Sequence, residues 1–151
     1  MDNKYELTDN TKEVEGHVLH QIKALKSFGD VKKGDLGGWV EDYDNLSQYG
    51  SAWVYGDAMV GDDARIEDHA RVYDNARVYD NAWVYDHTKV LDNAKVYDNA
   101  CIYDHARVLD NAQVGGNAKV HDDAQVFGQS QVMGDANVGG DLWINGSALV
   151  C

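Results

Sequence analysis

Branched apolar residues recur at every sixth position along most of the chain. From Val54 to Val150, each sixth residue is Val or Ile, at seventeen consecutive positions. Four positions after each of the first sixteen, the residue is usually small: it is Ala at thirteen of them, with Thr88, Ser130 and Leu142 as the exceptions. A spacing of six fits neither the 3.6-residue period of an α-helix nor the 3.5-residue period of a coiled coil. The pattern therefore indicates a repeat architecture.

The residues between the apolar positions are turn formers, as in the segments VYDNAR and VLDNAK. Val and Ile favour extended backbone, whereas Asp-Asn, Gly-Asp and Asp-His pairs tolerate tight or left-handed turns. One hexapeptide therefore predicts a short strand and a corner, with the branched and the small residue facing inward. A second period of eighteen residues, seen at His69, His87 and His105, indicates that three hexapeptides make one turn and that like residues stack on like faces.

Residues 1–35 lack the hexapeptide period. The segment EVEGHVLHQI alternates apolar and polar residues, which predicts short strands around a turn at Glu15–Gly16. An open end of a β-helix exposes unpaired backbone and apolar core. We therefore expect residues 1–35 to form a hairpin-like β cap and residues 36–151 to form the repeat domain.

The repeat is irregular at both ends. By spacing, Val40, Leu46 and Ala52 fall at the small-residue position, and Asp42 and Gln48 fall at the branched position, which predicts an imperfect first turn. At the other end, larger residues are expected either to plug the last turn or to form a docking surface: Leu142, Trp143 and Leu149.

The strict period resembles that of the hexapeptide-repeat family, whose members form left-handed parallel β-helices of triangular cross-section. This resemblance covers about residues 36–151 and implies an all-β fold with eighteen residues per turn. The left hand comes from the resemblance, because generic crossover rules favour the right hand. The segments KYELTD and FGDVKKGDLGGWV also resemble a small family of phage- and prophage-borne hexapeptide proteins of unassigned activity, which implies a genetic context more than a reaction.

Acidic residues dominate the repeat. The chain has 26 acidic and 13 basic side chains and a formal net charge of −13. Asp in a turn can accept hydrogen bonds from the backbone of its own turn, and like charges at about 4.8 Å repel by roughly 0.9 kcal/mol per pair in water. The third hexapeptide position is Asp in nine consecutive repeats, which the eighteen-residue turn would arrange as three columns: Asp62, Asp68, Asp74, Asp80, Asp86, Asp92, Asp98, Asp104 and Asp110.

This charge limits the function classes that the sequence supports. A solenoid of this length, roughly 31 Å, has around two thirds of the linear charge of duplex DNA, which carries one charge per about 1.7 Å. The charge argues against direct binding of nucleic acid and suits imitation of nucleic acid toward a basic partner. The solubility of a strand-rich rod is an alternative explanation of the same residues, and cation binding is another.

Aromatic and basic residues share the outward strand positions. Most tyrosines directly follow the branched position, and Arg or Lys often precedes it. A second wall is expected to carry Tyr79, Trp83, Tyr97, Cys101 and Met133, and cross-strand ladders are an alternative interpretation of both walls. The first wall is apolar for a solvated surface, and we expect a symmetric homo-oligomer, a dimer or a trimer, to bury it: Tyr55, Tyr73, Leu91, Leu109 and Phe127.

Histidines are the residues to consider for catalysis. Hexapeptide acyltransferases, by the resemblance above, use a His general base beside a CoA-linked or carrier-linked acyl group, and His87 and His105 would be the candidates here. Together with His69 they fill corner positions where neighbouring repeats have Asn, which favours a role in the turn. The repeat from 54 to 150 has no loop insertion that could close a cleft. Histidines about 4.8 Å apart are too far apart to share one ion comfortably, so we expect no metal and no cofactor.

Localisation and function follow from these features as expectations. Cys101 and Cys151 would lie nearly three turns apart, too far for an intramolecular disulfide, and no segment resembles a membrane span or a signal peptide. We predict a cytoplasmic protein that does not contact membranes. We further predict a non-enzymatic, phage-encoded accessory or anti-defence factor whose acidic corners bind a basic host or phage protein, as a DNA mimic would. The alternatives are a CoA-dependent acyltransferase and a structural module for oligomeric assembly.

Overall fold

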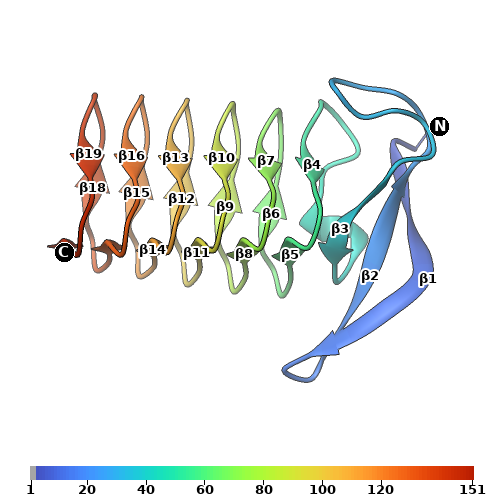
Figure 1. The fold of residues 1–151 in the computed structure, drawn as a ribbon, viewed down its shortest axis with the longest axis horizontal. Coiled ribbons are helices and arrows are strands. Elements are labelled where there is room, and N and C mark those ends of the chain that lie inside the picture. Colours follow the sequence, from blue (N-terminus) through green and yellow to red (C-terminus); the bar gives the residue numbers. More distant parts are fainter. Residues whose placement is uncertain (1–2) are drawn as a thin grey trace.

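The computed structural model describes residues 3–151 and consists of β-strands joined by short turns (Figure 1). Within these residues no α-helix occurs, and no helix is long and apolar enough to cross a membrane. The N-terminal part contains β1 (Tyr5–Val14), β2 (His17–Ala24), β3 (Leu36–Val40) and the 3₁₀ turn η1 (Tyr43–Asn45). Two-residue strands follow at a regular interval: β4 (Trp53–Val54), β5 (Met59–Val60), β6 (Arg65–Ile66), β7 (Arg71–Val72), β8 (Arg77–Val78), β9 (Trp83–Val84), β10 (Lys89–Val90), β11 (Lys95–Val96), β12 (Cys101–Ile102), β13 (Arg107–Val108), β14 (Gln113–Val114), β15 (Lys119–Val120), β16 (Gln125–Val126), β17 (Gln131–Val132), β18 (Asn137–Val138), β19 (Trp143–Ile144) and β20 (Leu149–Val150).

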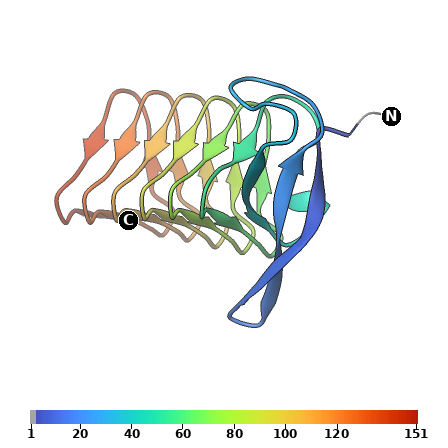
Figure 2. The same cartoon turned by 45° about the vertical axis from the view of Figure 1, so that its right-hand side comes forward.

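The chain is an all-β parallel solenoid of about six turns, as the repeat predicts. Each short strand pairs in parallel with the strand eighteen residues later, so that Val54 lies beside Val72 and Val72 beside Val90. Successive strands of the chain therefore lie in different sheets, and one strand from each sheet makes a turn (Figure 2). The three sheets have nine, six and five strands, in the orders β1-β2-β3-β5-β8-β11-β14-β17-β20, β4-β7-β10-β13-β16-β19 and β6-β9-β12-β15-β18.

The two inward positions of each hexapeptide form the core. The Val and Ile residues from Val54 to Val132 and the Ala residues from Ala52 to Ala124 have no exposed surface. Thr88, which replaces Ala, is also buried, and its hydroxyl donates a hydrogen bond to the carbonyl of Tyr85 at 3.0 Å. Burial of one Val side chain contributes on the order of 2 kcal/mol. The core is therefore a sum of many similar contributions, one from each repeat.

Each hexapeptide turns its corner at a residue with left-handed backbone. The residue two positions after the branched one has φ between 54° and 68°, and it is Asp at ten corners and Gly at six. Gly has no Cβ to clash in this region, and Asp tolerates it better than most other residues do. The backbone conformation thus explains why Asp and Gly are the two residue types at the corner position.

The first turn departs from the predicted register. Val40 lies beside Val60, and Leu46 forms a bridge with Ile66, so Val40 and Leu46 occupy the branched position. Their predicted assignment to the small-residue position is wrong, whereas Ala52 does occupy it. The shift arises because two extra residues lie between Leu46 and the first regular strand, where the chain makes a wider corner.

A buried polar side chain fills the irregular turn. Asp42, predicted to face inward, is exposed and caps η1, so that prediction is wrong as well. Asn45 has no exposed surface, and its amide nitrogen donates to the carbonyls of Asp62 and Ala64 at 3.0 and 2.9 Å. Its side-chain oxygen accepts from the backbone N–H of Asp42 at 2.8 Å. A residue outside the repeat therefore links the first turn to the second.

The hairpin of β1 and β2 extends the nine-stranded sheet (Figure 1). The two strands are antiparallel and turn at Glu15–Gly16, and β2 is antiparallel to β3. Tyr5 is fully buried, and its hydroxyl donates to the carbonyl of Leu46 at 2.6 Å. Gln48, predicted to face inward, is half-buried and accepts a hydrogen bond from the backbone N–H of Lys4 at 2.8 Å.

Residues 25–35 form a loop that packs on β4. The ring of Phe28 meets Trp53 edge to face, with ring centroids 5.2 Å apart, and Trp53 is 1% exposed. Lys4 is fully buried beside them, and its Nζ donates to the carbonyl of Ala52 at 2.7 Å. Burial, with a smaller effect of the charge of Lys26, lowers the pKa of Lys4 to about 8.

The larger residues of the last turn, Leu142, Trp143 and Leu149, are 53%, 65% and 66% exposed. Trp143 and Leu149 directly precede the branched positions, on the outside of the strands, so the interpretation of these two side chains as an internal plug is wrong. Leu142 is at the inward position of the open end, and its role as a plug stays a prediction. The use of all three as a docking surface stays a prediction.

Candidate functional site

The nine aspartates predicted to bind a partner all lie at the left-handed corner position. Because residues eighteen apart stand one above another, they form three columns, one beside each sheet. The column after the nine-stranded sheet is Asp62, Asp80 and Asp98, that after the five-stranded sheet is Asp68, Asp86 and Asp104, and that after the six-stranded sheet is Asp74, Asp92 and Asp110.

Each of these carboxylates accepts a hydrogen bond from the backbone of the next turn. Oδ2 of Asp74 accepts from the N–H of Asp92 at 3.3 Å, and Oδ2 of Asp92 accepts from the N–H of Asp110 at 3.1 Å. The other seven carboxylates make the equivalent bond at 2.9–3.2 Å. The expectation that Asp bonds to its own turn is therefore corrected. The carboxylate reaches along the column, so the backbone fixes its position.

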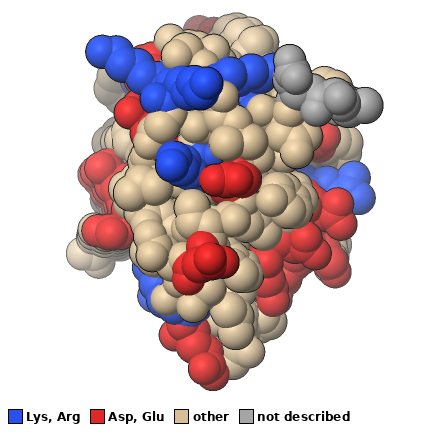
Figure 3. Space-filling model, turned by 90° about the vertical axis from the view of Figure 1, so that its right-hand side faces the viewer, with Lys and Arg blue, Asp and Glu red and all other residues tan. Residues whose placement is uncertain are grey.

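These carboxylates are largely unpaired with basic groups. Among the described residues, Asp62 alone of the nine has a basic side chain within 4.0 Å, Nε2 of His17 at 3.4 Å. Arg and Lys of the repeat stand directly before the branched position, in the strands. Acidic and basic groups are therefore segregated, and acidic side chains project from both flanks of the N-terminal end (Figure 3).

The three corner histidines form a stack. The rings of His69 and His87 lie 4.8 Å apart and those of His87 and His105 lie 5.2 Å apart, both nearly parallel. Nδ1 of His69 makes a hydrogen bond with Oγ of Ser51 at 2.7 Å. Among the described residues, no carboxylate lies within 4.0 Å of His87 or His105. The two residues named for a transferase thus have the spacing expected of a ladder, and catalysis by them stays a prediction.

The residues of the predicted oligomer wall form one continuous column. All five follow strands of the six-stranded sheet, and all are half-buried on its outside: Tyr55, Tyr73, Leu91, Leu109 and Phe127. The first two rings meet edge to face at 5.8 Å. Burial raises the pKa of Tyr73, and nearby Arg107 opposes the shift. The same sheet also carries a basic column, formed by Arg71, Lys89 and Arg107.

The second predicted wall combines two different faces. Tyr79, Tyr97 and Met133 belong to the nine-stranded sheet, whereas Trp83 and Cys101 belong to the five-stranded sheet, so their grouping is wrong. The error arises because a corner separates each tyrosine from the following strand.

The five-stranded sheet carries an aromatic ladder that sequence reasoning missed. Tyr85, Tyr103 and His121 stack with ring centroids 5.3 and 5.0 Å apart. Nδ1 of His121 lies 3.2 Å from Oδ2 of Asp122, and its Nε2 makes a hydrogen bond with Asn137. The signal was present in the sequence, because His121 follows a branched residue eighteen positions after Tyr103.

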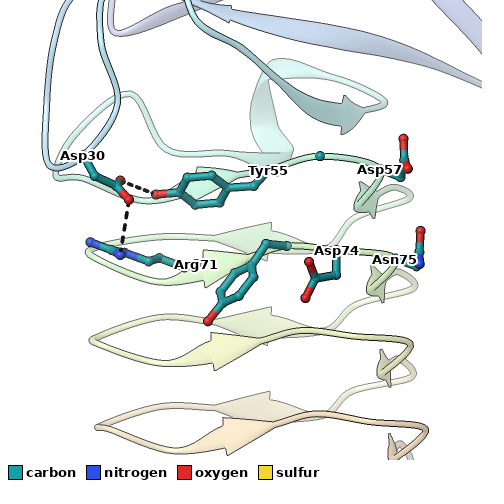
Figure 4. Close-up of a pocket in the computed structure, with 8 residues that line it drawn as sticks. Asp30, Tyr55, Asp57, Arg71, Asp74 and Asn75 are labelled. Carbon is teal, nitrogen blue, oxygen red and sulfur yellow. Dashed lines mark hydrogen bonds and ion pairs between the residues drawn. The ribbon is translucent and has the colours of Figure 1, made fainter.

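An open hollow of about 560 Å³ lies where the loop meets the six-stranded sheet (Figure 4). The hydroxyl of Tyr55 donates to Oδ1 of Asp30 at 2.8 Å, and Nη1 of Arg71 lies 3.7 Å from Oδ2 of the same residue. Burial, followed by this hydrogen bond, raises the pKa of Tyr55. Asp57 and Asp74 line the hollow farther along the strands. The loop is thus held on the β4 end of the apolar wall.

His17 ties the hairpin tip to the solenoid. Its Nδ1 lies 3.0 Å from Oε2 of Glu41, and its Nε2 lies 3.4 Å from Oδ1 of Asp62. The hydrogen bond with Glu41, and then the charges of Glu41 and Asp62, raise the pKa of His17. These three side chains, like Asp104, His121 and Asp122, are close enough together to hold a metal ion. In both groups the imidazole already pairs with a carboxylate, and we assign neither group to a metal.

The chain is similar to known repeat solenoids over part of its length. The family model described as YdcK Beta solenoid repeat matches residues 70–86 and 100–116. Each matched segment spans three successive strands, β7 to β9 and β12 to β14. No curated protein matches the chain. The family model and the fold together identify a repeat β-solenoid protein.

Proposed function

We propose that this protein binds a basic, nucleic-acid-handling protein through its acidic corners and that it does so without catalysis. The observation that carries the proposal is the set of nine corner carboxylates, each fixed by the backbone of the next turn and, Asp62 apart, without a basic side chain within 4.0 Å among the described residues. The charge is therefore presented at a regular spacing rather than neutralised within the fold.

The physical reason for binding is the mutual repulsion of these charges. Carboxylates stacked at about 4.8 Å repel by roughly 0.9 kcal/mol per pair in water, before screening by salt. A basic groove that covers a column relieves this repulsion. Because the hydrogen bonds hold the carboxylates in place, a partner has little side-chain freedom to remove when it binds.

The handedness of the solenoid, its cross-section and the role of the N-terminal hairpin are part of the same proposal. We infer a left-handed solenoid of triangular cross-section, supported by the three sheets and by the resemblance to hexapeptide-repeat proteins. The hairpin that continues the nine-stranded sheet supports its role as a cap over the first turn. The resemblance of residues 4–9 and 28–40 to phage-borne proteins supports a phage-encoded accessory or anti-defence factor. We also propose a homo-oligomer that buries the apolar wall.

The proposal is tested with a variant that changes the nine predicted corner aspartates, Asp62 to Asp110, to Asn, which tolerates left-handed backbone and keeps an oxygen acceptor. A matched control changes nine other acidic residues to Asn or Gln: Glu6, Asp9, Glu13, Asp44, Asp57, Asp63, Asp123, Asp135 and Asp141. A small basic DNA-binding protein serves as the probe, and its displacement from labelled duplex DNA is read by fluorescence anisotropy.

We expect wild type and the control to displace the probe from DNA, with an effect that weakens as salt rises, and the corner variant to displace it at least tenfold less well. Equal displacement by the corner variant and wild type contradicts the proposal. An acyltransferase would instead be stabilised against heat by CoA and would lose activity in His87→Ala or His105→Ala, whereas we expect no shift with CoA.

A further inference from the structure

The outside of the six-stranded sheet is the least charged side of the solenoid. The repeats that begin on its strands, from residue 53 onward, carry three basic and four acidic side chains. The repeats of the nine-stranded sheet from residue 59 onward carry two basic and five acidic side chains, and those of the five-stranded sheet carry two and seven. In a chain of net charge −13, only the six-stranded side is close to neutral.

Charge on this side is ordered in columns. Across each of β7, β10 and β13, an outward basic residue is followed by a buried Val, a half-buried apolar or aromatic residue and the corner Asp, as in Arg71, Val72, Tyr73 and Asp74. Parallel pairing stacks this order over these three turns. The face therefore has a basic column (Arg71, Lys89 and Arg107), an apolar column (Tyr73, Leu91, Leu109 and Phe127) and an acidic column (Asp74, Asp92 and Asp110).

We propose that this face binds the same face of a second copy, about a two-fold axis parallel to the solenoid. A rotation about such an axis reverses the order of columns across the face and keeps the order of turns. The basic column of each copy then lies opposite the acidic column of the other, and the two apolar columns meet near the axis. A two-fold axis along the strands would set basic against basic and acidic against acidic, so the charges select the parallel arrangement.

The strength of this contact follows from its size. The apolar column of this face runs from β7 to β16, because the loop of residues 25–35 covers β4 and the polar residue Asn145 follows β19. Four strands at about 4.8 Å and a side of six residues at about 3.3 Å give a contact of roughly 400 Å² per copy. Specific interfaces commonly bury about 800 Å² per partner, so we expect a weak dimer with a dissociation constant in the micromolar range or above.

The inference deepens the proposed burial of the apolar wall, and it rests on that part of the proposed function. It leaves the acidic columns beside the nine-stranded and five-stranded sheets uncovered, so the dimer can still bind a basic partner. The two proposals have separate outcomes. A protein that does not dimerise can still bind a basic partner at its corners, and a protein that binds no such partner can still dimerise.

The first test is sedimentation velocity at protein concentrations from about 5 µM to 1 mM, a range set by the expected affinity. We expect a dimer that weakens as salt rises, and at least tenfold weaker association when Arg71, Lys89 and Arg107 are all changed to Glu. The control changes Arg65, Arg77 and Lys95 to Glu, which alters the net charge equally on the other two sheets and should leave most of the association. A wild-type monomer throughout, a trimer, or equal loss in both variants overturns the proposal.

The second test reads the symmetry by cross-linking. In a background with Cys101→Ser and Cys151→Ser, a single Leu91→Cys or Phe127→Cys is oxidised at dimer-forming concentration. A parallel two-fold axis brings each residue near its own copy, so both variants should form disulfide-linked dimers. Tyr97→Cys, at the same position on the nine-stranded sheet, serves as the control and should stay monomeric. Cross-linking at only one of the two levels, or equal cross-linking of the control, overturns the parallel arrangement.

Discussion

The regular repeat and the N-terminal part achieve burial in opposite ways. From residue 53 onward, the same two inward positions are filled by Val or Ile and by a small residue in turn after turn, so any one repeat resembles the next. Up to residue 53, burial depends on single side chains that no period places, such as Tyr5, Asn45, Lys4 and, at the boundary, Trp53. A period therefore specifies the solenoid, whereas individual contacts specify where it begins.

The largest expected effect is at Trp53. Its side chain is buried between Phe28 and Tyr5, and Trp53→Ala should lower the free energy of unfolding by about 3–5 kcal/mol, because it removes a large aromatic side chain from a packed site. Trp143 occupies the same position of the same sheet but is exposed, so Trp143→Ala should cost less than about 0.5 kcal/mol. Urea denaturation of both variants checks the difference, and similar losses would contradict the contrast between the two regions.

A second effect concerns Lys4 and pH. Its pKa in the folded protein, about 8, is below the unfolded value near 10.5, so the unfolded state binds more protons between these values and stability rises with pH. From pH 7 to 9.5 the free energy of unfolding should rise by about 2 kcal/mol from this cause. Above pH 10 the tyrosines with raised pKa act in the opposite direction, so the window stops there. The free energy of unfolding of wild type minus that of Lys4→Met should rise as the pH is raised across this range. A difference that does not change with pH would contradict the burial of a charged Lys4.

A smaller effect is expected at the corners. Asp92→Ala removes both the tolerance of left-handed backbone and the acceptor for the N–H of Asp110, so it should cost about 1–2 kcal/mol. Asp92→Asn keeps both features and should change stability by less than about 0.5 kcal/mol. Thermal unfolding of the pair separates the structural role of the corner residue from its charge. An equal loss in both variants would show that the charge itself holds the turn.

The smallest effect is local. The pKa of His17 is raised, so the stabilisation it gives to the hairpin tip is full below its unfolded pKa and is lost as the pH rises through the folded value. Amide exchange at the tip should therefore accelerate, relative to the rest of the hairpin, as the imidazole loses its proton. In Glu41→Gln the main cause of the shift is gone, and an NMR titration of His17 should move down toward the ordinary value. An unchanged titration would show that the Glu41 contact does not form.

The solenoid could be predicted from the sequence because one period repeats the same physical requirement many times. Val, Ala and Asp each return at a fixed spacing, so residue type and spacing alone place the core, the corners and the columns of Asp74 and Tyr73. The first turn could not be placed in this way, because two extra residues moved Val40 and Leu46 into the branched position without a change in residue type. The direction of the Asp hydrogen bonds depends on the left-handed backbone at the corner. Residue types suggest this backbone conformation, but they do not show that the carboxylate points toward the next turn.

The candidate site could be predicted only in part, because only some of its contacts lie within the repeat. The acidic columns and the apolar wall followed from the period, but the pairing of His17 with Asp62 joins the hairpin to a corner far along the chain. The ladder of Tyr103 and His121 was overlooked because the position after the branched residue holds Tyr in one turn and His in the next. Contacts between repeated and unrepeated segments have no periodic signal, and these contacts place the loop and the hairpin beside the columns.

The most direct test of the central claim is a parallel pull-down from lysate with wild type and with the variant that carries Asn at the nine predicted corner positions, 62 to 110. We expect wild type to retain a basic nucleic-acid-binding protein at low salt, to release it as salt rises, and to lose it to competing duplex DNA. The corner variant should retain little of the same protein. Retention of the same proteins by both baits, unaffected by DNA, would contradict the claim that the acidic corners bind a basic partner.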